Sequence, residues 1–285
     1  IMLGWGPYQN DHEDANGQFE MNWDFSNCLQ TADRHVFFKF MVRTLAEKKG
    51  LRATFMPKPF LNKTGNGCHA HLSIWNKEGK NMFADKKDEL GLSKTAYNFM
   101  GGIMNSAEAL TACFNPTINS YKRINAPVTA SGATWAPNTI TYSGNNRTHM
   151  IRVPGPGRFE LRLMDGATNP YLLQAGILAA GIDGIEKNRN PGKPINVNMY
   201  EDGHKVKGAK KLPLTLEKAL SHLDKSKVLK DAFSKETINS YIKLKNKEIK
   251  KYNSSGIKKI GFKGSKQSNK KSIITQWEKD NTLDC

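Results

Sequence analysis

One stretch of the chain places two histidines two residues apart, directly after a glycine-bearing loop. It reads Thr64-Gly-Asn-Gly-Cys-His-Ala-His-Leu-Ser73. Because alternate side chains of a strand point to the same side, His69 and His71 are expected to share one face with Ser73. A single histidine on a strand is more often structural, but imidazole is also a common metal ligand.

A second stretch, Arg158-Phe-Glu-Leu-Arg162, places a carboxylate between two guanidinium groups on one face of a predicted strand. In such a row the carboxylate can bind a metal ion and the guanidinium groups can bind a phosphate. A third cluster, Asp11-His-Glu-Asp14, is followed by Gly17-Gln-Phe-Glu20. Burying this many unpartnered charges would cost several kcal/mol each, so the three stretches together favour one shared polyvalent ligand.

Hydrophobic periodicity predicts the elements that must position these stretches. Thr31 is the predicted N-cap of a helix over residues 31–49, which ends at Gly50. The apolar stripe of this helix is expected in the core and consists of Val36, Phe37, Phe40, Met41 and Leu45. Further helices are expected over 93–114, 169–188, 215–223 and 236–252, and strands over 18–23, 51–56, 148–153 and 158–164 beside the histidine strand. Residues 115–123 and 125–146 are expected to form loops.

Nothing in the sequence indicates a membrane span or a secretory signal. No stretch approaches about 18 continuous apolar residues, and the start lacks the basic and then apolar layout of a signal peptide. Cys28, Cys68, Cys113 and Cys285 show no short paired spacing, so reduced thiols are expected rather than a zinc site or disulfides. These features favour a globular protein of the cytoplasm with no membrane partner.

The net charge of +17 is unevenly distributed along the chain. Residues 1–185 contain 19 basic and 15 acidic residues, whereas residues 186–285 contain 24 and 11. Nearly all cations of the second part are lysines scattered among Asn, Ser and Ile, without interleaved aromatic residues. The pattern therefore favours a solvated lysine-rich surface over a specific nucleic-acid site.

Taken in order, these stretches resemble the consecutive signatures of the catalytic part of glutamine synthetases. The matching segments are His12-Glu13, Gly17-Gln-Phe-Glu20, Phe55-Met-Pro-Lys-Pro59, Gly65 to Ser73, Asn115 to Arg123, Asn146-Arg147, Arg152, Arg158 to Arg162 and Asn169-Pro-Tyr171. The resemblance is strong over residues 5–185 and weak over the lysine-rich remainder. An ordered set of this length is far more specific than one short motif.

The resemblance implies an ATP-dependent ligase that phosphorylates the side-chain carboxylate of glutamate and then lets ammonia or a small amine displace the phosphate. Glu13 and Glu20 would hold one divalent ion, and His69 and Glu160 would hold another. Carboxylates with one imidazole suit Mg²⁺ or Mn²⁺, two or more ions per site. Such ions neutralise the charge of a transferring phosphoryl group.

The resemblance also assigns the residues that bind the substrates. Those expected beside ATP are Phe25, His71, Ser73, Arg152 and Arg158. Arg147 and Arg162 are the expected catalytic residues, because planar guanidinium groups chelate phosphate and carboxylate oxygens. Arg123 and Arg162 would capture the carboxylates of glutamate, and the backbone of Gly65 would approach its amino group.

One departure from the family concerns the acceptor amine. Many members carry a flap glutamate, between a tyrosine and Ala-Pro, that accepts a proton from bound ammonium. Here Thr134-Trp-Ala-Pro137 aligns with that flap, so an indole replaces the carboxylate. Trp135 is therefore the residue expected at the acceptor site, and the chain resembles the subgroup that makes gamma-glutamylmethylamide from methylamine. Ammonia and methylamine both stay open as acceptors. A non-catalytic structural or regulatory subunit stays open as an alternative function.

The fold expected from the resemblance is α+β. A curved, mainly antiparallel sheet would form the active-site face, backed by the helices over 31–49, 93–114 and 169–188. The family also implies a homo-oligomer of stacked rings.

Residues 1–285 are expected to form one catalytic domain that is incomplete at its N-terminus, since the small N-terminal domain of the family is not in the sequence. Residues 1–188 would be the core with the site motifs, and residues 189–285 a lysine-rich helical part. Within that part, residues 253–271 are low in complexity and expected to be mobile.

Overall fold

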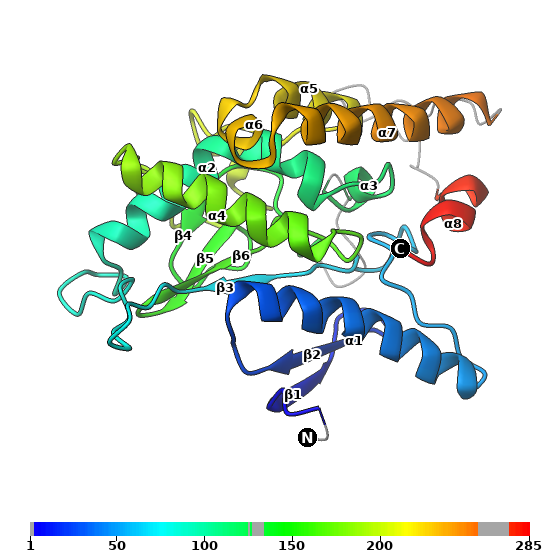
Figure 1. Ribbon diagram of the computed structural model, residues 1–285, viewed down its shortest axis with the longest axis horizontal. Coiled ribbons are helices and arrows are strands. Elements are labelled where there is room, and N and C mark those ends of the chain that lie inside the picture. The colour runs from blue at the N-terminus through cyan, green and yellow to red at the C-terminus, as the bar shows by residue number, and fades with distance from the viewer. Residues whose placement is uncertain (1–2, 125, 127–133, 256–273) are drawn as a thin grey trace.

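Two β-sheets and a set of helices build the α+β fold of this computed structural model, which describes residues 3–124, 126, 134–255 and 274–285 (Figure 1). The strands are β1 (Pro7–His12), β2 (Phe19–Trp23), β3 (Ala70–Leu72), β4 (Tyr142–Ser143), β5 (Ile151–Gly155) and β6 (Arg158–Leu161). The helices are α1 (Cys28–Lys48), α2 (Lys94–Phe114), α3 (Ser120–Ile124), α4 (Pro170–Glu186), α5 (Leu216–Lys225), α6 (Lys227–Phe233), α7 (Lys235–Ser254) and α8 (Gln276–Thr282), with a 3₁₀ turn at Gly203–Lys205.

The larger sheet has the strand order β3-β6-β5-β4. The pairs β3/β6 and β5/β6 are antiparallel, and only β4/β5 is parallel, so the mainly antiparallel sheet is confirmed. Its register pairs Glu160 of β6 with His71 on one side and Arg152 on the other. Strands β1 and β2 form a separate antiparallel hairpin.

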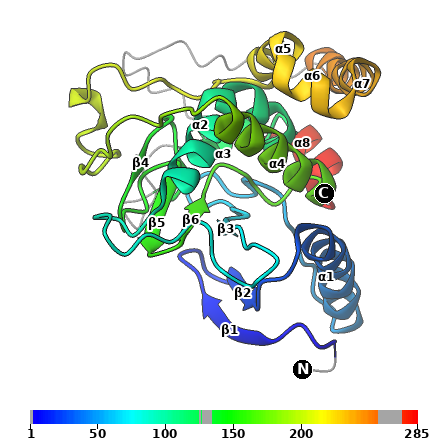
Figure 2. The same ribbon diagram turned by 60° about the vertical axis from the view of Figure 1, so that its left-hand side comes forward.

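Helices α2 and α4 pack closely together over the larger sheet, and α5 to α7 form a further layer outside them (Figure 2). Both predicted helices are confirmed, with Ser93 and Asn169 as N-caps. Their contact depends on glycine, because a Cβ at Gly102 would lie 2.0 Å from the carbonyl oxygen of Ala180. A Cβ at Gly184 would likewise lie 2.1 Å from the carbonyl oxygen of Asn98.

Helix α1 differs from its prediction at both its start and its packing. It begins at Cys28, and the side chain of Asn27 rather than Thr31 caps it by accepting a hydrogen bond from the backbone N–H of Gln30 at 2.9 Å. The apolar stripe expected in the core is wrong for the described chain, since Phe37 is 44% and Phe40 63% exposed. Apolar side chains occur all around α1, so only one side can face the rest of the fold.

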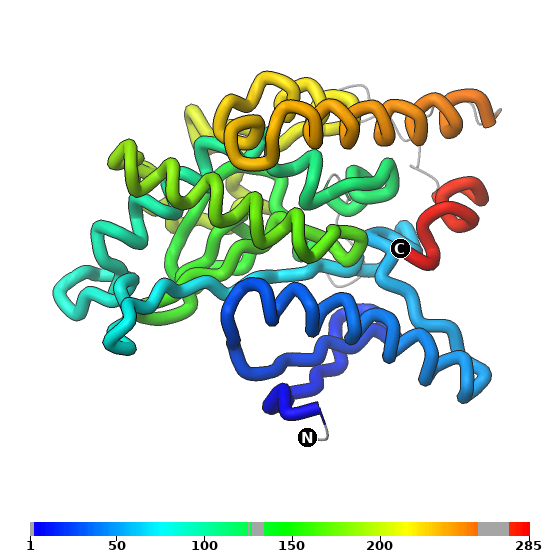
Figure 3. Tube along the Cα trace, viewed as in Figure 1, coloured from blue at the N-terminus to red at the C-terminus, as the bar shows by residue number. Residues whose placement is uncertain are grey.

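The segment predicted as a strand over 51–56 is an extended coil (Figure 3). Its polar contacts go to side chains and to the C-terminus instead of to a neighbouring strand. The hydroxyl of Thr54 donates to the carbonyl of Leu283 at 2.6 Å and accepts from the backbone N–H of Met56 at 3.1 Å. Pro57 and Pro59 follow and lack the N–H groups that a sheet ladder needs.

In the C-terminal part, α5 and α7 lie close to the predicted ranges 215–223 and 236–252. Of the segment expected to be mobile, residues 253 and 254 end α7, and residues 256–271 lie outside the described residues. The prediction of a loop over 115–123 is corrected in part, because the short helix α3 begins at Ser120. No helix among the described residues is both long and apolar enough to cross a membrane.

Candidate active site

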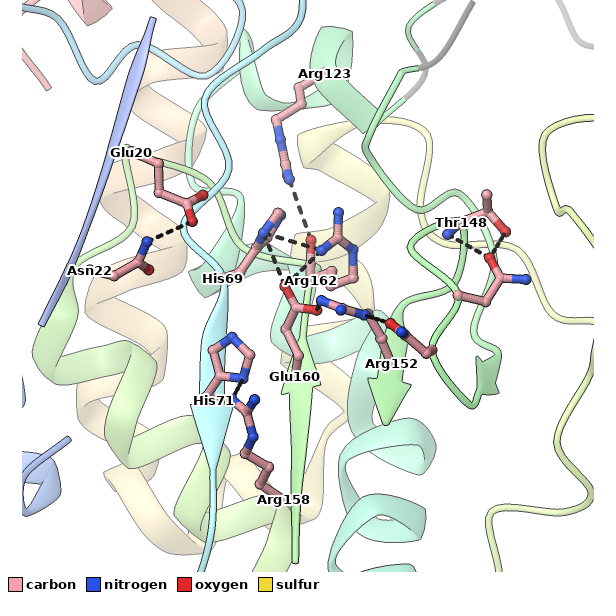
Figure 4. Close-up of polar contacts among 12 residues, drawn as sticks. Glu20, Asn22, His69, His71, Arg123, Thr148, Arg152, Arg158, Glu160 and Arg162 are labelled. Atoms are coloured by element: carbon pink, nitrogen blue, oxygen red, sulfur yellow. Dashed lines mark hydrogen bonds and ion pairs between the residues drawn. The ribbon is translucent and has the colours of Figure 1, made fainter. Parts of the chain in front are cut away.

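The charged face of the larger sheet is centred on the carboxylate of Glu160 (Figure 4). One oxygen, Oε1, lies 2.7 Å from Nη1 of Arg162 and 3.3 Å from Nδ1 of His69. The other, Oε2, accepts a hydrogen bond from Nη1 of Arg152 at 2.9 Å. Three predicted site residues from β5 and from the ends of β3 and β6 therefore meet at the buried carboxylate of a fourth.

These contacts fix the charge states of the group. Burial alone would favour a protonated Glu160, but His69 and the two arginines hold its pKa well below the usual range, so it is ionised. Burial, followed by the charge of Arg162, lowers the pKa of His69 to about 4, so its imidazole is neutral at pH 7. The nearby carboxylate favours a proton on Nδ1, which leaves the lone pair of Nε2 available as a ligand.

The residues predicted to bind the nucleotide extend along the same face toward the outer end of β3. Nη1 of Arg158 lies 2.8 Å from Nδ1 of His71. Beyond them, Ser73 accepts a hydrogen bond from the indole N–H of Trp75 at 3.0 Å. Phe25 is 80% exposed, and its ring lies parallel to that of Trp75 with centroids 6.1 Å apart. Trp75 was not among the predicted site residues, although its position two residues after Ser73 on an alternating stretch places it on the same face.

The acidic hairpin brings Glu13 and Glu20 together, as predicted. Burial and then the negative charge of Glu20 raise the pKa of Glu13, which indicates that the two carboxylates lie close enough to repel each other. The turn of the hairpin is attached to the glycine loop, because the amide of Gln18 donates to the carbonyl of Gly65 at 3.1 Å and to the side chain of Asn66 at 2.8 Å. Figure 4 shows Glu20 reaching from β2 toward His69.

The predicted glutamate-binding residues also converge. Arg123 is almost fully buried, and its guanidinium group donates to the carbonyls of Leu163 at 3.0 Å and Arg162 at 3.3 Å. Gly65 packs directly on this side chain, since a Cβ there would lie 3.2 Å from Cγ of Arg123. The Nε atom of Arg162 is buried without a hydrogen-bond partner among the described residues.

Two predicted residues lie at the edge of the group. Arg147 is exposed in the turn between β4 and β5, and the described structure gives it no hydrogen bond or ion pair. Trp135 adopts φ 54°, a strained conformation for a non-glycine residue, and its indole N–H is buried without a described partner. Burial raises the pKa of Tyr200, whereas Thr134, Arg162 and Arg123 oppose that shift. The Tyr200 hydroxyl is buried without a hydrogen-bond partner among the described residues. Sequence reasoning missed Tyr200, because it follows the site motifs within an irregular segment.

The residues present fit divalent ions. Nε2 of His69 is buried and makes no hydrogen bond to a described residue, so its lone pair can bind a metal ion. The close pair Glu13 and Glu20 has the hard oxygen atoms that Mg²⁺ or Mn²⁺ prefers. No group of three or more His, Cys, Asp or Glu side chains that could hold a metal occurs in the described ranges.

The fold and this site define an α+β catalytic domain whose active face is a charged sheet. The family profile described as "Glutamine synthetase, catalytic domain" matches residues 3–261. The chain therefore belongs to the glutamine synthetase family.

Individual relatives agree with this assignment. The chain is 58% identical over 285 residues to a glutamine synthetase of Rhizobium leguminosarum bv. phaseoli, covering all of this chain and 61% of that protein. It is 45% identical over 255 residues to the glutamate–methylamine ligase of Methyloversatilis universalis, covering 88% of this chain and 57% of the relative. The chain thus spans about three fifths of the length of these curated relatives.

A solved structure described as a GmaS/ADP complex superposes with a TM-score of 0.85. It is 56% identical, and the match covers all of this chain and 61% of that one. A ligand-free GmaS structure gives a TM-score of 0.82 at 54% identity. These matches confirm the predicted fold.

Proposed function

We propose that the full-length protein is an ATP-dependent ligase that joins the side-chain carboxylate of L-glutamate to ammonia or a small amine. The observation that carries the proposal is the convergence of His69, Arg152 and Arg162 on the ionised carboxylate of Glu160. Membership of the glutamine synthetase family supports it. When bound, Mg²⁺ or Mn²⁺ held by Glu13, Glu20, His69 and Glu160 would neutralise phosphate charge.

In the first step of this reaction, a glutamate side-chain oxygen forms a bond to the γ-phosphorus of ATP, and the bond from that phosphorus to ADP breaks. Arg123 and Gly65 would hold glutamate, while His71, Ser73, Phe25 and Arg158 would hold the nucleotide. Arg147 and Arg152 would chelate oxygens of the transferred phosphoryl group. Guanidinium groups suit this role because they bind two oxygens at once.

In the second step, the amine attacks the carbonyl carbon of the gamma-glutamyl phosphate. A C–N bond forms, the C–O bond to phosphate breaks, and the amine loses a proton. Arg162 would stabilise the leaving phosphate and the developing negative charge. Because Trp135 replaces the flap carboxylate in the sequence, another base or the solvent must accept this proton.

A narrower proposal concerns the amine. The sequence aligns Trp135 with the flap carboxylate of the family, and its indole is partly buried, with the ring N–H making no hydrogen bond to a described residue. Similarity to a glutamate–methylamine ligase and to GmaS structures favours methylamine as an acceptor. The family also supports a homo-oligomer of stacked rings, and the cytoplasm stays the predicted compartment.

The test uses the full-length protein with ATP, Mg²⁺, glutamate and either ammonia or methylamine. We expect amine-dependent release of phosphate together with formation of the amide. A folded protein that releases no phosphate with any amine would contradict the ligase and favour a non-catalytic structural or regulatory subunit. Omission of glutamate is the matched control for ATP hydrolysis alone.

A further inference from the structure

A glutamate of the C-terminal helix, outside the charged sheet, has an unusually complete set of partners. Glu278 is fully buried. Its Oε1 accepts from the side-chain amide of Asn119 at 3.0 Å, and its Oε2 accepts from the backbone N–H and hydroxyl of Thr275 at 2.9 and 2.8 Å. Lys122 forms an ion pair with the same oxygen.

Helix capping explains only part of this arrangement. Thr275 and Glu278 form a capping box at the start of α8. A capping glutamate works equally well at the surface, where its carboxylate keeps its hydration. A buried carboxylate is costly unless it is paired and hydrogen-bonded, and here the additional partners, Asn119 and Lys122, both come from the segment that carries Arg123.

The first connection runs through α3. Lys122 binds Glu278, and the next residue, Arg123, donates to the carbonyls of Leu163 and Arg162. The five-residue helix is thus held between α8 on one side and the end of β6 on the other. A helix this short has little stability of its own, so its position depends on these contacts.

The second connection runs through Asn119, which is fully buried. Its side chain accepts from the backbone N–H of Lys58 at 2.7 Å and donates to the carbonyl of Lys58 at 3.0 Å. The preceding carbonyl, that of Pro57, accepts from the N–H of Asn66 at 2.9 Å. A Cβ at Gly65 would lie only 2.4 Å from this Pro57 oxygen, so the glycine loop rests directly on it.

Both connections therefore end at the proposed glutamate subsite. Gly65 lies close to Arg123, since a Cβ there would lie 3.2 Å from Cγ of Arg123, and each residue is supported by a segment attached to Glu278. Figure 1 shows α8 beside α3 and the coil that leads from α1 to β3.

We infer that Glu278 is a positioning residue for the glutamate subsite, holding Arg123 and the Gly65 loop at a fixed separation. The inference rests on the proposed function, since it takes the assignment of Gly65 and Arg123 to glutamate from there. These groups hold the non-reacting end of the substrate, so their displacement weakens ground-state and transition-state binding alike. Such a change raises KM and leaves kcat nearly unchanged.

The test is Glu278→Gln in the full-length protein. The glutamine keeps the size and the capping ability of the side chain, but its amide group must face at least one donor from Asn119, Thr275 or Lys122. We expect KM for glutamate to rise by about tenfold or more, with kcat and KM for ATP changed by less than about twofold.

Asp284→Asn is the matched control, because it loosens the same C-terminal segment without touching α3. Asp284 receives both of its hydrogen bonds from Arg52, at 2.8 and 2.7 Å, and is exposed. We expect its KM for glutamate to equal that of the wild type. A folded Glu278→Gln protein with the same KM as Asp284→Asn would overturn the inference. If Glu278→Gln does not fold, Glu278→Asp carries the same test, and an unchanged KM there would overturn it equally.

Failure of the proposed function is distinguishable from failure of the inference. A wild-type protein without ligase activity contradicts the proposed function. Hydrogen exchange then tests the role of Glu278, because Glu278→Gln, and not Asp284→Asn, should lose protection at the amides of α3 and of residues 57–66. Equal protection in both variants would overturn the inference without any measurement of activity.

Discussion

At the scale of single residues, Glu160 is the side chain on which the site depends. It joins β3, β5 and β6 through His69, Arg152 and Arg162. We predict that Glu160→Gln lowers ligase activity by about 10- to 100-fold while the fold persists, because the substitution is nearly isosteric but removes the charge that we propose to bind a metal ion. Steady-state rates, Mn²⁺ titration and circular dichroism of the full-length variant check this. Unchanged activity and metal affinity would remove Glu160 from the metal site.

The two histidines of β3 have different surroundings and should behave differently. His69 contacts Glu160 and has a buried free nitrogen, whereas His71 contacts the exposed Arg158. We therefore predict that His69→Ala weakens metal binding and that His71→Ala mainly raises KM for ATP. The two variants are each other's control in a metal titration and an ATP titration. Equal metal defects in both would mean that the two roles are assigned wrongly.

Trp135 is predicted to set the preference among amines. An indole attracts an alkylammonium ion by cation–π contact and buries its methyl group, each worth roughly 0.5 to 2 kcal/mol. Without a flap carboxylate, deprotonation of ammonium lacks its usual base. Methylamine should therefore compete well with ammonia, and Trp135→Glu should shift preference toward ammonia. The measurement is kcat/KM for both amines in both proteins. A wild-type preference for ammonia that the substitution leaves unchanged would exclude Trp135 from the acceptor site.

Single residues were predictable from the sequence where reactive or charged side chains recur at the two-residue spacing of a strand. The alternation that places Arg158, Glu160 and Arg162 on one face follows from strand geometry and needs no tertiary information. Tyr200, whose pKa the charges of Arg123 and Arg162 influence, could not be found in this way, because it lies in an irregular segment. A tyrosine outside a periodic element carries no sequence signal of where its hydroxyl points.

At the scale of elements, the contact between α2 and α4 gives a prediction of stability. Gly102→Ala should destabilise the protein by about 1–3 kcal/mol, because its new Cβ would lie 2.0 Å from the Ala180 oxygen and the helices would have to separate. Gly155→Ala is the control, since a Cβ there meets nothing within 4 Å. Urea unfolding of the two variants decides it. Equal midpoints would mean that the helix contact tolerates the added methyl group.

Elements with strong end signals were predictable, and those without them were not. Helices α2 and α4 have capping residues directly before a long apolar pattern, and both were located within two residues. The segment 51–56 has the composition of a strand, yet it is surrounded by side-chain and C-terminal partners instead of another strand. Helix α8 is only seven residues long, and its stability comes from the buried contacts of Glu278, which no local pattern reveals.

At the scale of the whole molecule, the site is assembled from segments distant in sequence. The side chain of Gln18 connects the hairpin with Glu13 and Glu20 to the glycine loop. His69, which follows that loop, contacts Glu160 of β6. The sequence motifs predicted that these segments meet, because they resemble one family in one order. The supporting contacts beneath them, including the attachment of the C-terminal helix to α3, became visible only in three dimensions.

The distribution of charge leads to the last prediction. The lysine-rich helices α5 to α7 carry many cations, but several described ones are paired, as in Lys227–Asp231, Lys230–Asp224 and Lys245–Glu248. Paired and scattered lysines neutralise few phosphates at once, so binding to duplex DNA should be no tighter than the non-specific range of about 1–100 µM at physiological salt. Fluorescence anisotropy of a labelled duplex, titrated with the full-length protein between low and physiological salt, measures this. The matched control is a lysine-rich protein of similar net charge that has no DNA-binding function. Bovine albumin cannot serve as this control, because it is acidic. A submicromolar Kd at physiological salt with a steep salt dependence would contradict the interpretation of this surface as merely solvated.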